Sequence, residues 1–183
     1  MDIYDIIKSR RAIREFEPDP IDNAVVKRIM DAAIWAPSAL NSQNWKFYIL
    51  TGVKRDQFAS LLRPVFDQMK DTIQKSYGPK DVEIRRRLYM NAGDAPVIII
   101  CYAEDVWNGD LVGPAMACQN ILLAAKSEGL GSLFMGAVRY VKDAVNEFLS
   151  EKDLFLVGAI LIGKAKSVPE PRPRREGRII YLK

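Results

Sequence analysis

Pro96-Val97-Ile98-Ile99-Ile100-Cys101-Tyr102 is the stretch that decides the fold class of this chain. Its unbroken β-branched run is typical of a strand covered on both faces, because a half-exposed strand would alternate apolar and polar residues. Further strands are expected at Leu154 to Gly163 and at Phe47 to Thr51. Helix-like segments separate these strands, so the sequence predicts a mixed α and β protein with a layered core.

Apolar residues at helical spacing mark the helices expected around these strands. Asp2 to Ser9 forms one helix, and Asp22 caps a second that ends near Trp35. No repeat or linker divides the chain, so residues 1–183 are expected to fold as a single domain. Gly131 to Gly136 is expected to be a short strand or loop, and the remaining helices are expected at Lys54 to Ser76, Lys80 to Asn91, Asp110 to Glu128 and Val141 to Leu149.

The composition is that of an ordinary globular protein, with 49% hydrophobic and 27% charged residues. No apolar run approaches the roughly 20 residues that span a bilayer. The start, Met1 to Asp5, is acidic and unlike a secretory signal, so we expect a cytoplasmic protein with no membrane partner. The net charge of +4 is mild and its basic residues are not interleaved with aromatic ones, so we expect no nucleic-acid partner.

The chain contains no histidine and only two cysteines, Cys101 and Cys118. This excludes Ser-His-Asp and Cys-His catalysis and nearly all catalytic zinc sites. Two cysteines are also too few for structural zinc or an iron–sulfur cluster, and both lie in surroundings typical of small buried hydrophobes. We therefore expect no metal site, and we expect difficult chemistry to come from an organic cofactor.

The first candidate binding segment is Ser9-Arg10-Arg11-Ala12-Ile13-Arg14-Glu15-Phe16. In an extended loop alternate side chains point the same way, so Arg10 and Arg14 are expected to converge while Ile13 and Phe16 turn to the core. Two guanidinium groups presented together suit a phosphate or carboxylate, to which each donates paired hydrogen bonds. Taken alone, the segment also fits a solvated basic loop.

A second candidate segment, Ala36-Pro37-Ser38-Ala39-Leu40-Asn41-Ser42-Gln43-Asn44-Trp45, joins an expected helix to an expected strand. Ser38, Asn41 and Gln43 offer donors and acceptors that suit the edge of a polar ring or a polyol chain. Capping and turn chemistry ahead of the strand explains the same composition equally well.

The third candidate segment is Gly129-Leu130-Gly131-Ser132-Leu133-Phe134-Met135-Gly136. Its glycines follow a helix and precede a strand, which is the opposite of the order in a dinucleotide-binding fingerprint. They are better suited to letting the backbone approach a flat ligand closely.

Basic residues also gather in two other places. Arg85-Arg86-Arg87 is most simply the solvated face of a helix, and Arg172 and Arg174 alone would belong to a basic tail without a specific role. The tail is proline-rich and ends in an apolar, strand-like segment, Arg178 to Leu182, with little to pack on locally. Residues 164–183 are therefore expected to form an extended arm that reaches a distant surface, such as the edge of a partner's sheet.

In this order, the three candidate segments and the basic tail segment, Gly163-Lys164 followed by Pro171-Arg172-Pro173-Arg174-Arg175, resemble the nitroreductase family of flavoenzymes. The most specific pieces are Arg10 to Phe16 and the Ala36-Pro37-Ser38 segment, and the helix with Asn120-Ile121-Leu122-Leu123-Ala124-Ala125 lies between the second and third pieces. The resemblance implies an α+β fold, with a central, mostly antiparallel sheet wrapped by helices. It also implies an intertwined homodimer with exchange of the C-terminal arm and FMN at the dimer interface.

The same resemblance implies which residues hold FMN. The first motif and the tail would contact the phosphate and ring oxygens, the second motif would come from the partner subunit, and the glycine segment would lie near the reactive ring nitrogen. The implied cofactor-binding residues are Arg10, Arg11, Ala12, Arg14, Pro37, Ser38, Asn41, Gln43, Phe134, Met135, Gly136, Arg172 and Arg174.

Two positions depart from the family pattern. The family usually has serine where this chain has Ala12, so one hydroxyl donor is missing. A neutral hydrogen bond contributes about 1 kcal/mol net, so the loss should weaken flavin binding without abolishing it. The family often has proline where this chain has Asn44, which leaves the shape of that loop open.

The resemblance implies a two-step exchange in which NADH or NADPH delivers a hydride to FMN and leaves, and an electron acceptor then takes its place. No protein base is needed, which agrees with the missing histidine. Arg10 and Arg14 would supply electrostatic support for the reduced flavin. Nitroaromatic compounds, quinones and similar small molecules all suit a broad flat pocket, and neither nicotinamide is preferred.

Several alternatives remain open. The same fold permits a flavin-fragmenting enzyme or a reductive dehalogenase, although the short stretch from Glu104 to Gly113 leaves little room for a large lid. Trp107 could line the substrate face or simply pack on the surface. A protein that binds FMN for storage or signalling without turnover, and a basic nucleic-acid-binding module, are alternatives from other classes.

Overall fold

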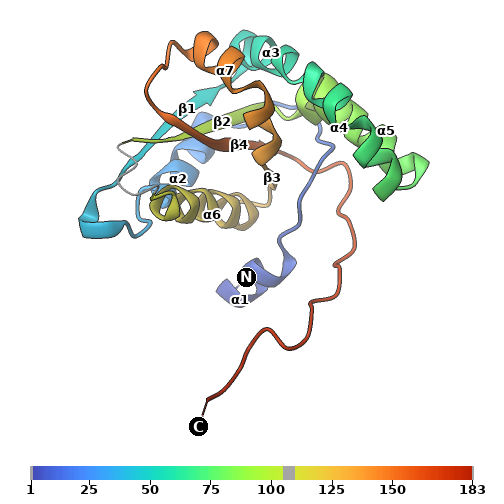
Figure 1. Cartoon of the computed structure of the whole chain (residues 1–183). Coiled ribbons are helices and arrows are strands. Elements are labelled where there is room, and N and C mark those ends of the chain that lie inside the picture. Colours follow the sequence, from blue (N-terminus) through green and yellow to red (C-terminus); the bar gives the residue numbers. More distant parts are fainter. Residues whose placement is uncertain (1, 105–109, 183) are drawn as a thin grey trace.

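A four-stranded antiparallel sheet lies at the centre of the computed structural model, which describes residues 2–104 and 110–182 (Figure 1). Trp107 lies outside the described residues. The strands stand in the order β1-β2-β4-β3. They are β1 (Trp45–Leu50), β2 (Val97–Ala103), β3 (Gly131–Met135) and β4 (Phe155–Gly163).

The expectation that β2 is covered on both faces is confirmed, since every residue of the strand is buried. Ile98, Ile100 and Tyr102 belong to one hydrophobic cluster, and Ile99 and Cys101 belong to another. Because successive side chains of a strand point to opposite faces, the two clusters lie on opposite sides of the sheet. The fold thus has three layers.

Helices cover both faces of the sheet, as Figure 1 shows. One face packs on α2 and α6, and the other packs on α3, α4, α5 and α7. Asp22 caps α2 as predicted, because its carboxylate accepts a hydrogen bond from the Ala24 amide at 2.8 Å. The helices are α1 (Ile3–Ser9), α2 (Asn23–Ala33), α3 (Gly52–Leu61), α4 (Arg63–Ser76), α5 (Pro79–Asn91), α6 (Val112–Ser127) and α7 (Lys142–Leu149).

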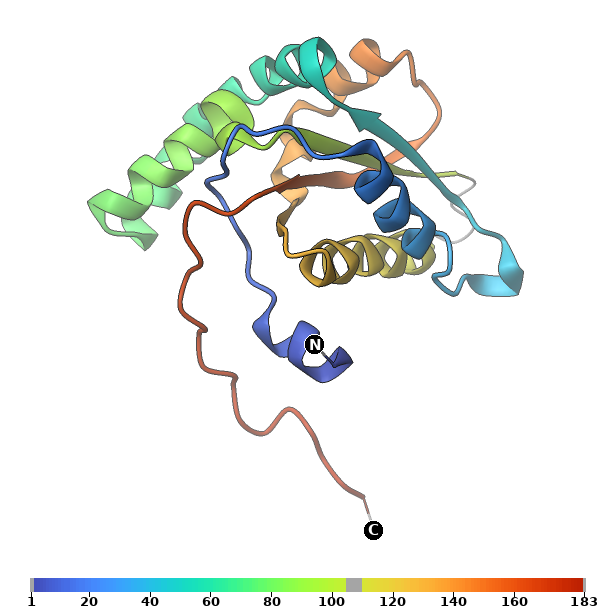
Figure 2. The same cartoon turned by 180° about the vertical axis from the view of Figure 1, so that it is seen from behind.

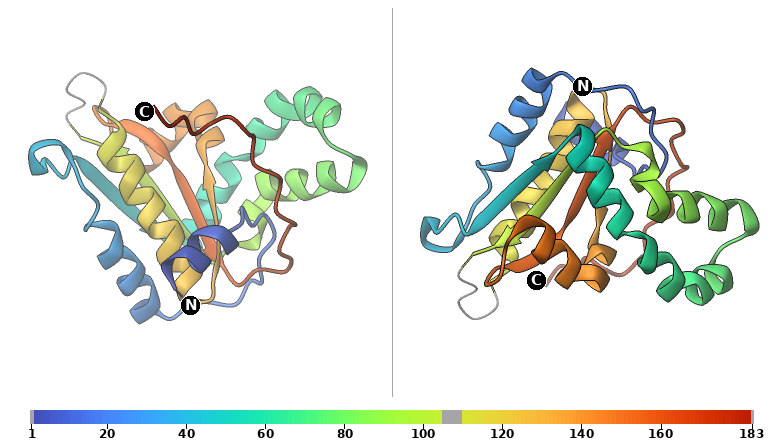
Figure 3. Two further views of the ribbon diagram at one scale, coloured as in Figure 1. Left: turned by 90° about the horizontal axis from the view of Figure 1, so that it is seen from below. Right: turned by 90° about the horizontal axis from the view of Figure 1, so that it is seen from above.

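The single helix predicted from Lys54 to Ser76 is wrong, because the chain forms two helices, α3 and α4. The break falls at Leu62, and Pro64 occupies the first turn of α4. Proline has no amide hydrogen to donate and its ring collides with the carbonyl four residues earlier, so one helix does not run through this position. The break turns α4 away from α3, and α4 and α5 then form a projecting hairpin (Figure 3).

The arginine segment is held between the edge strand β3 and the start of the tail (Figure 2). Ala12 forms a parallel bridge with Ser132, and Phe16 forms an antiparallel bridge with Ala165. The Ile13 amide donates to the Ser132 carbonyl at 3.0 Å. Ile13 and Phe16 are buried as predicted, so their side chains anchor the segment in the core.

The tail after residue 166 is extended and leaves its own sheet (Figures 1 and 3). The strand-like ending forms no strand within the described part of the chain, and Ile179 to Leu182 are all exposed. Pairing with a partner's sheet therefore stays a prediction. Among the described helices, none has the length and apolar character needed to cross a bilayer.

Candidate functional site

Arg10 and Arg14 lie along the same edge of β3, and each lines a different cavity, so their convergence on one ligand stays a prediction. Arg10 lines a cavity of about 60 Å³ with Lys126 and Ser132. Arg14 lines a cavity of about 260 Å³ with Phe134 to Gly136. Four residues of extended backbone span about 13 Å, so the two arginines stand at different places along this edge.

The cavity at Arg14 contains a second arginine that the sequence placed in solvent. Arg85 of α5 is buried, and its guanidinium lies 3.4 Å from the centre of the Tyr77 ring. Burial lowers the pKa of Arg14, and the positive charge of Arg85 lowers it further. The interpretation of Arg85 as part of a solvated face is therefore wrong, whereas Arg86 and Arg87 are exposed and pair with Glu83.

The tail brings two more arginines to the same edge. Burial lowers the pKa of Arg10, and so do the positive charges of Arg11 and Arg174. The positive charge of Arg172 likewise lowers the pKa of Arg14. Arg10 thus lies close enough to Arg174, and Arg14 to Arg172, for their charges to interact, and the edge of β3 carries a line of cations.

Arg11 has a local partner of a different kind. Its guanidinium donates to the carbonyls of Lys8 at 2.6 Å and Arg10 at 2.9 Å, at the end of α1. These contacts satisfy carbonyls that a helix end leaves free. In this structure Arg11 therefore stabilises the turn from α1 into the segment, while Ala12 lies beside Ser132.

The end of β3 presents an aromatic surface. The Phe134 ring lies directly over Gly158, where a Cβ atom would come within 2.6 Å of the ring. Phe134 remains 38% exposed, whereas Met135 is buried. Gly136 follows, and the Arg139 side chain packs against it. The glycine at position 158 therefore leaves room for the Phe134 ring, part of which stays exposed.

The second candidate segment lies at the other end of the sheet in the same chain (Figures 1 and 3). Ser38 Oγ accepts a hydrogen bond from the Gln43 amide at 2.9 Å, which closes the loop after Pro37. Leu40, Asn41 and Gln43 all have positive φ, and the Leu40 side chain is fully exposed. The structure does not bring this loop to the arginines of its own chain.

Asn44 ties this loop to α6. Its side-chain amide donates to the Asp110 carbonyl at 3.1 Å, and Gly113 packs closely against its Oδ1. The Asn44 carbonyl accepts from the Glu104 amide at 2.9 Å. Asparagine at this position therefore anchors the loop by side-chain hydrogen bonding, which a proline does not provide.

A family model described as the Nitroreductase family matches residues 7–164, which is most of the chain. The chain belongs to the nitroreductase family. Among solved structures, an FMN-dependent nitroreductase from Mycobacterium smegmatis, in complex with NADPH, has a similar fold, with a TM-score of 0.83, 18% identity, and 98% of this chain and 97% of that chain covered. The predicted α+β architecture of this family is thereby confirmed.

Curated relatives carry related names. A putative NADH dehydrogenase/NAD(P)H nitroreductase from Methanothermobacter thermautotrophicus is 29% identical, and the match covers 74% of this chain and 61% of the relative. The chain thus spans about three fifths of that protein. A nitrobenzene nitroreductase from Ectopseudomonas oleovorans is 28% identical, with 70% of each chain covered.

Three side chains that line these two cavities were not predicted from the sequence as site residues: Arg85, Lys126 and Ser132. Arg85 could have been found, because Val82, Arg85 and Tyr89 follow helical spacing and place the arginine on the apolar face of α5. Ser132 lies in the third candidate segment but was not among its predicted ligands. Lys126 carries no comparable signal, since only the folded chain brings it to Arg10.

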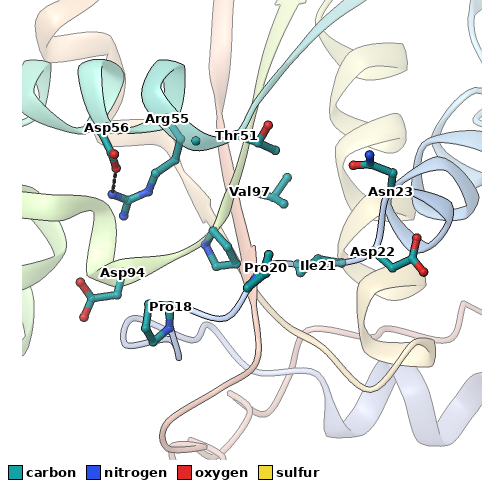
Figure 4. A pocket seen from close by; sticks show the side chains of 12 residues that line it. Pro18, Pro20, Ile21, Asp22, Asn23, Thr51, Arg55, Asp56, Asp94 and Val97 are labelled. Carbon is teal, nitrogen blue, oxygen red and sulfur yellow. Dashed lines mark hydrogen bonds and ion pairs between the residues drawn. The ribbon is translucent and has the colours of Figure 1, made fainter.

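A larger cavity of about 620 Å³ lies elsewhere in this nitroreductase-family chain (Figure 4). Its cation, Arg55, donates to the Ala95 carbonyl at 2.7 Å and pairs with Asp56 at 2.8 Å, so its donors already have partners. None of the predicted site residues is among its described lining residues. In the described part of the chain, no cluster of His, Cys, Asp and Glu side chains could hold a metal ion.

Proposed function

We propose that this chain is an FMN-dependent oxidoreductase that takes a hydride from NADH or NADPH and reduces a nitroaromatic compound, a quinone or a similar small acceptor. The observation that carries the proposal is the line of arginines along the edge of β3, of which Arg10 and Arg14 are partly buried, in a chain of this family. The relatives named as NAD(P)H and nitrobenzene nitroreductases support the same reaction class.

The described residues fit FMN in both charge and spacing. Arg10 and Arg174 offer positive charge at one end of the edge, where a phosphate would bind. Arg14 and Arg85 offer it at the other end, about 13 Å along the extended backbone, where the polar rim of a ring would lie. Phe134 provides an open aromatic surface at that second end.

FMN, when bound, supplies the hydride chemistry, and the protein orients it and shapes its electrostatics. Arg14 would favour negative charge on the bound ring, because a cation withdrawn from water acts more strongly than one in solvent. Its guanidinium already donates to the Ala12 carbonyl at 3.1 Å, which holds the side chain along the segment. Phe134 would exclude water from one face of the ring.

We further propose that the working unit is a homodimer and that the Pro37–Gln43 loop completes the partner's site. Three non-glycine residues of this loop have positive φ, a conformation that is uncommon and persists where the surroundings enforce it. Leu40 and Trp35 are exposed apolar side chains on the same loop and its approach. A second copy of the chain would cover both side chains and bring Ser38, Asn41 and Gln43 to the flavin.

The proposal is tested by the chromophore of the purified protein. The protein is denatured after purification, and the released small molecules are separated by chromatography and identified by mass. We expect FMN at close to one per chain, together with a sedimenting species of two chains. Absence of FMN after reconstitution with an excess of the cofactor would contradict the proposal.

A further inference from the structure

Ser132 on β3 is a buried side chain without a partner. It is only 2% exposed, and its Oγ forms no hydrogen bond with any described residue. A buried hydroxyl that has left water without replacing its hydrogen bonds is unfavourable. The atom therefore indicates a ligand or water that binds at this point.

The cavity at Ser132 is built for an anion. Arg10, Arg11 and Lys126 line it together with Ser132, and no acidic residue is among its described lining residues. Its volume of about 60 Å³ exceeds the roughly 30 Å³ that a water molecule occupies in the liquid. The lining thus combines cationic donors with the hydroxyls of Ser9 and Ser132, a set that suits phosphate oxygens.

Ser132 also lies beside Ala12, the residue at which a hydroxyl donor is missing. Ala12 and Ser132 are bridge partners, and paired residues in a sheet carry their side chains on the same face. The resemblance to the family implies a serine at position 12, where this chain has alanine. A hydroxyl on residue 132 therefore reaches the same small region of the surface that a hydroxyl on residue 12 would reach.

Ser132 lies on the same face of the sheet as Phe134, the residue proposed to contact the flavin ring. Ser132 and Phe134 are two residues apart on β3, so both side chains lie on the same face of the sheet. Ser132 is at the Arg10 end of this edge and Phe134 is at the Arg14 end. A molecule with its ring on Phe134 and its chain along β3 would place its far end at Ser132.

We propose that the Ser132 hydroxyl is a ligand of the flavin phosphate and supplies the neutral donor that Ala12 lacks. This inference rests on the proposed FMN function. A water molecule bound to Ser132 and a contact with the ribityl chain are the two competing explanations of the unpartnered hydroxyl.

Flavin affinities of the apoprotein distinguish these explanations. FMN and riboflavin, which lacks the phosphate, are each titrated into wild type, Ser132→Ala, Ala12→Ser and the double variant, and binding is followed by flavin fluorescence. Ser60→Ala is the matched control, because Ser60 is an exposed serine on α3 whose hydroxyl donates to the Gln57 carbonyl. We expect Ser132→Ala to weaken FMN binding about 10-fold, as for a lost hydrogen bond to a charged group, and to leave riboflavin binding unchanged.

The second substitution provides an internal check. Ala12→Ser should restore most of the FMN affinity in the Ser132→Ala background and add less in wild type, because the two hydroxyls would serve one phosphate. The apoprotein of Ser132→Ala should unfold at a temperature no lower than wild type, since it loses an unpaired polar group.

Three results would overturn the inference: FMN binding unchanged in Ser132→Ala, equal weakening of FMN and riboflavin, or no rescue by Ala12→Ser. Failure of wild type to bind either flavin would instead reject the proposed function.

Discussion

Arg14 is the single residue on which the flavin assignment depends most. It is partly buried and borders the cavity that Phe134 also lines. The like charge of Arg85 nearby lowers the pKa of Arg14. Arg14→Ala should weaken FMN binding about 10- to 100-fold, as expected for loss of a hydrogen bond to a charged group. It should therefore release FMN more readily than any change at Ala12.

Flavin absorbance before and after dialysis measures this release. Arg86→Ala is the matched control, because Arg86 is exposed and pairs with Glu83 at 2.8 Å on the surface of α5. Full flavin occupancy of Arg14→Ala after dialysis would show that Arg14 does not hold the cofactor.

Gly93 lies between α5 and β2 and contacts the backbone of the arginine segment. Its φ is +60°, and an added Cβ atom would overlap the Arg14 carbonyl oxygen. Its own carbonyl accepts from the Phe16 amide at 2.8 Å. Gly93→Ala should therefore displace Arg14, lowering both the free energy of unfolding and FMN affinity.

Gly52→Ala is the control for Gly93→Ala, because Gly52 also has a positive φ but nothing lies within 4 Å of its added Cβ. It should cost about 1–2 kcal/mol, the cost of a left-handed conformation for an L-residue. Urea unfolding and FMN titration measure both variants. Equal losses of stability, with FMN affinity preserved in both, would show that Gly93 does not position Arg14.

Tyr102 joins β2 to α7, since its hydroxyl donates to Asn146 Oδ1 at 2.7 Å. Burial raises the pKa of Tyr102 to about 12, whereas an unfolded tyrosine titrates near 10. Between these values the unfolded chain has lost the proton and the folded chain keeps it, so the free energy of unfolding falls as pH rises. Wild type should therefore lose stability relative to Tyr102→Phe from pH 10 to 12, by up to about 1.4 kcal/mol per pH unit.

Denaturant unfolding of the two proteins at several pH values checks this prediction. Below pH 10 the difference between wild type and Tyr102→Phe should be constant, because the phenol is protonated in both states. A difference that stays constant up to pH 12 would show that the Tyr102 pKa is not raised.

The secondary-structure elements were largely predictable from sequence, but the contacts between segments distant in the sequence were not. The β-branched run of β2 and the Asp22 cap are local signals, and both are confirmed. The break at Leu62 was not predicted, because the helical pattern of the sequence continues through it and the effect of Pro64 was not given enough weight. The separate cavities at Arg10 and Arg14 depend on the bridge between Ala12 and Ser132, a contact across more than a hundred residues that no local pattern encodes.

At the scale of the whole molecule, the exposed arm should hold two chains together. Removing residues 176–183 deletes the apolar ending but keeps Arg172 and Arg174, so it should weaken the dimer while phosphate recognition remains. Removing residues 167–183 also deletes both arginines and should additionally reduce the preference for FMN over riboflavin. Sedimentation velocity and flavin titration measure the two effects. A full-length chain that sediments as a monomer at micromolar concentration would contradict the assembly.

Anaerobic stopped-flow reduction of the FMN-loaded protein tests the central claim most directly. NADH and NADPH are mixed separately with the protein, absorbance in the flavin band is followed, and a nitroaromatic or quinone acceptor is added in a second mixing step. We predict that at least one nicotinamide bleaches the band and that the acceptor restores it without oxygen. A bound flavin that neither nicotinamide reduces would contradict the account and indicate a protein that binds FMN without turnover.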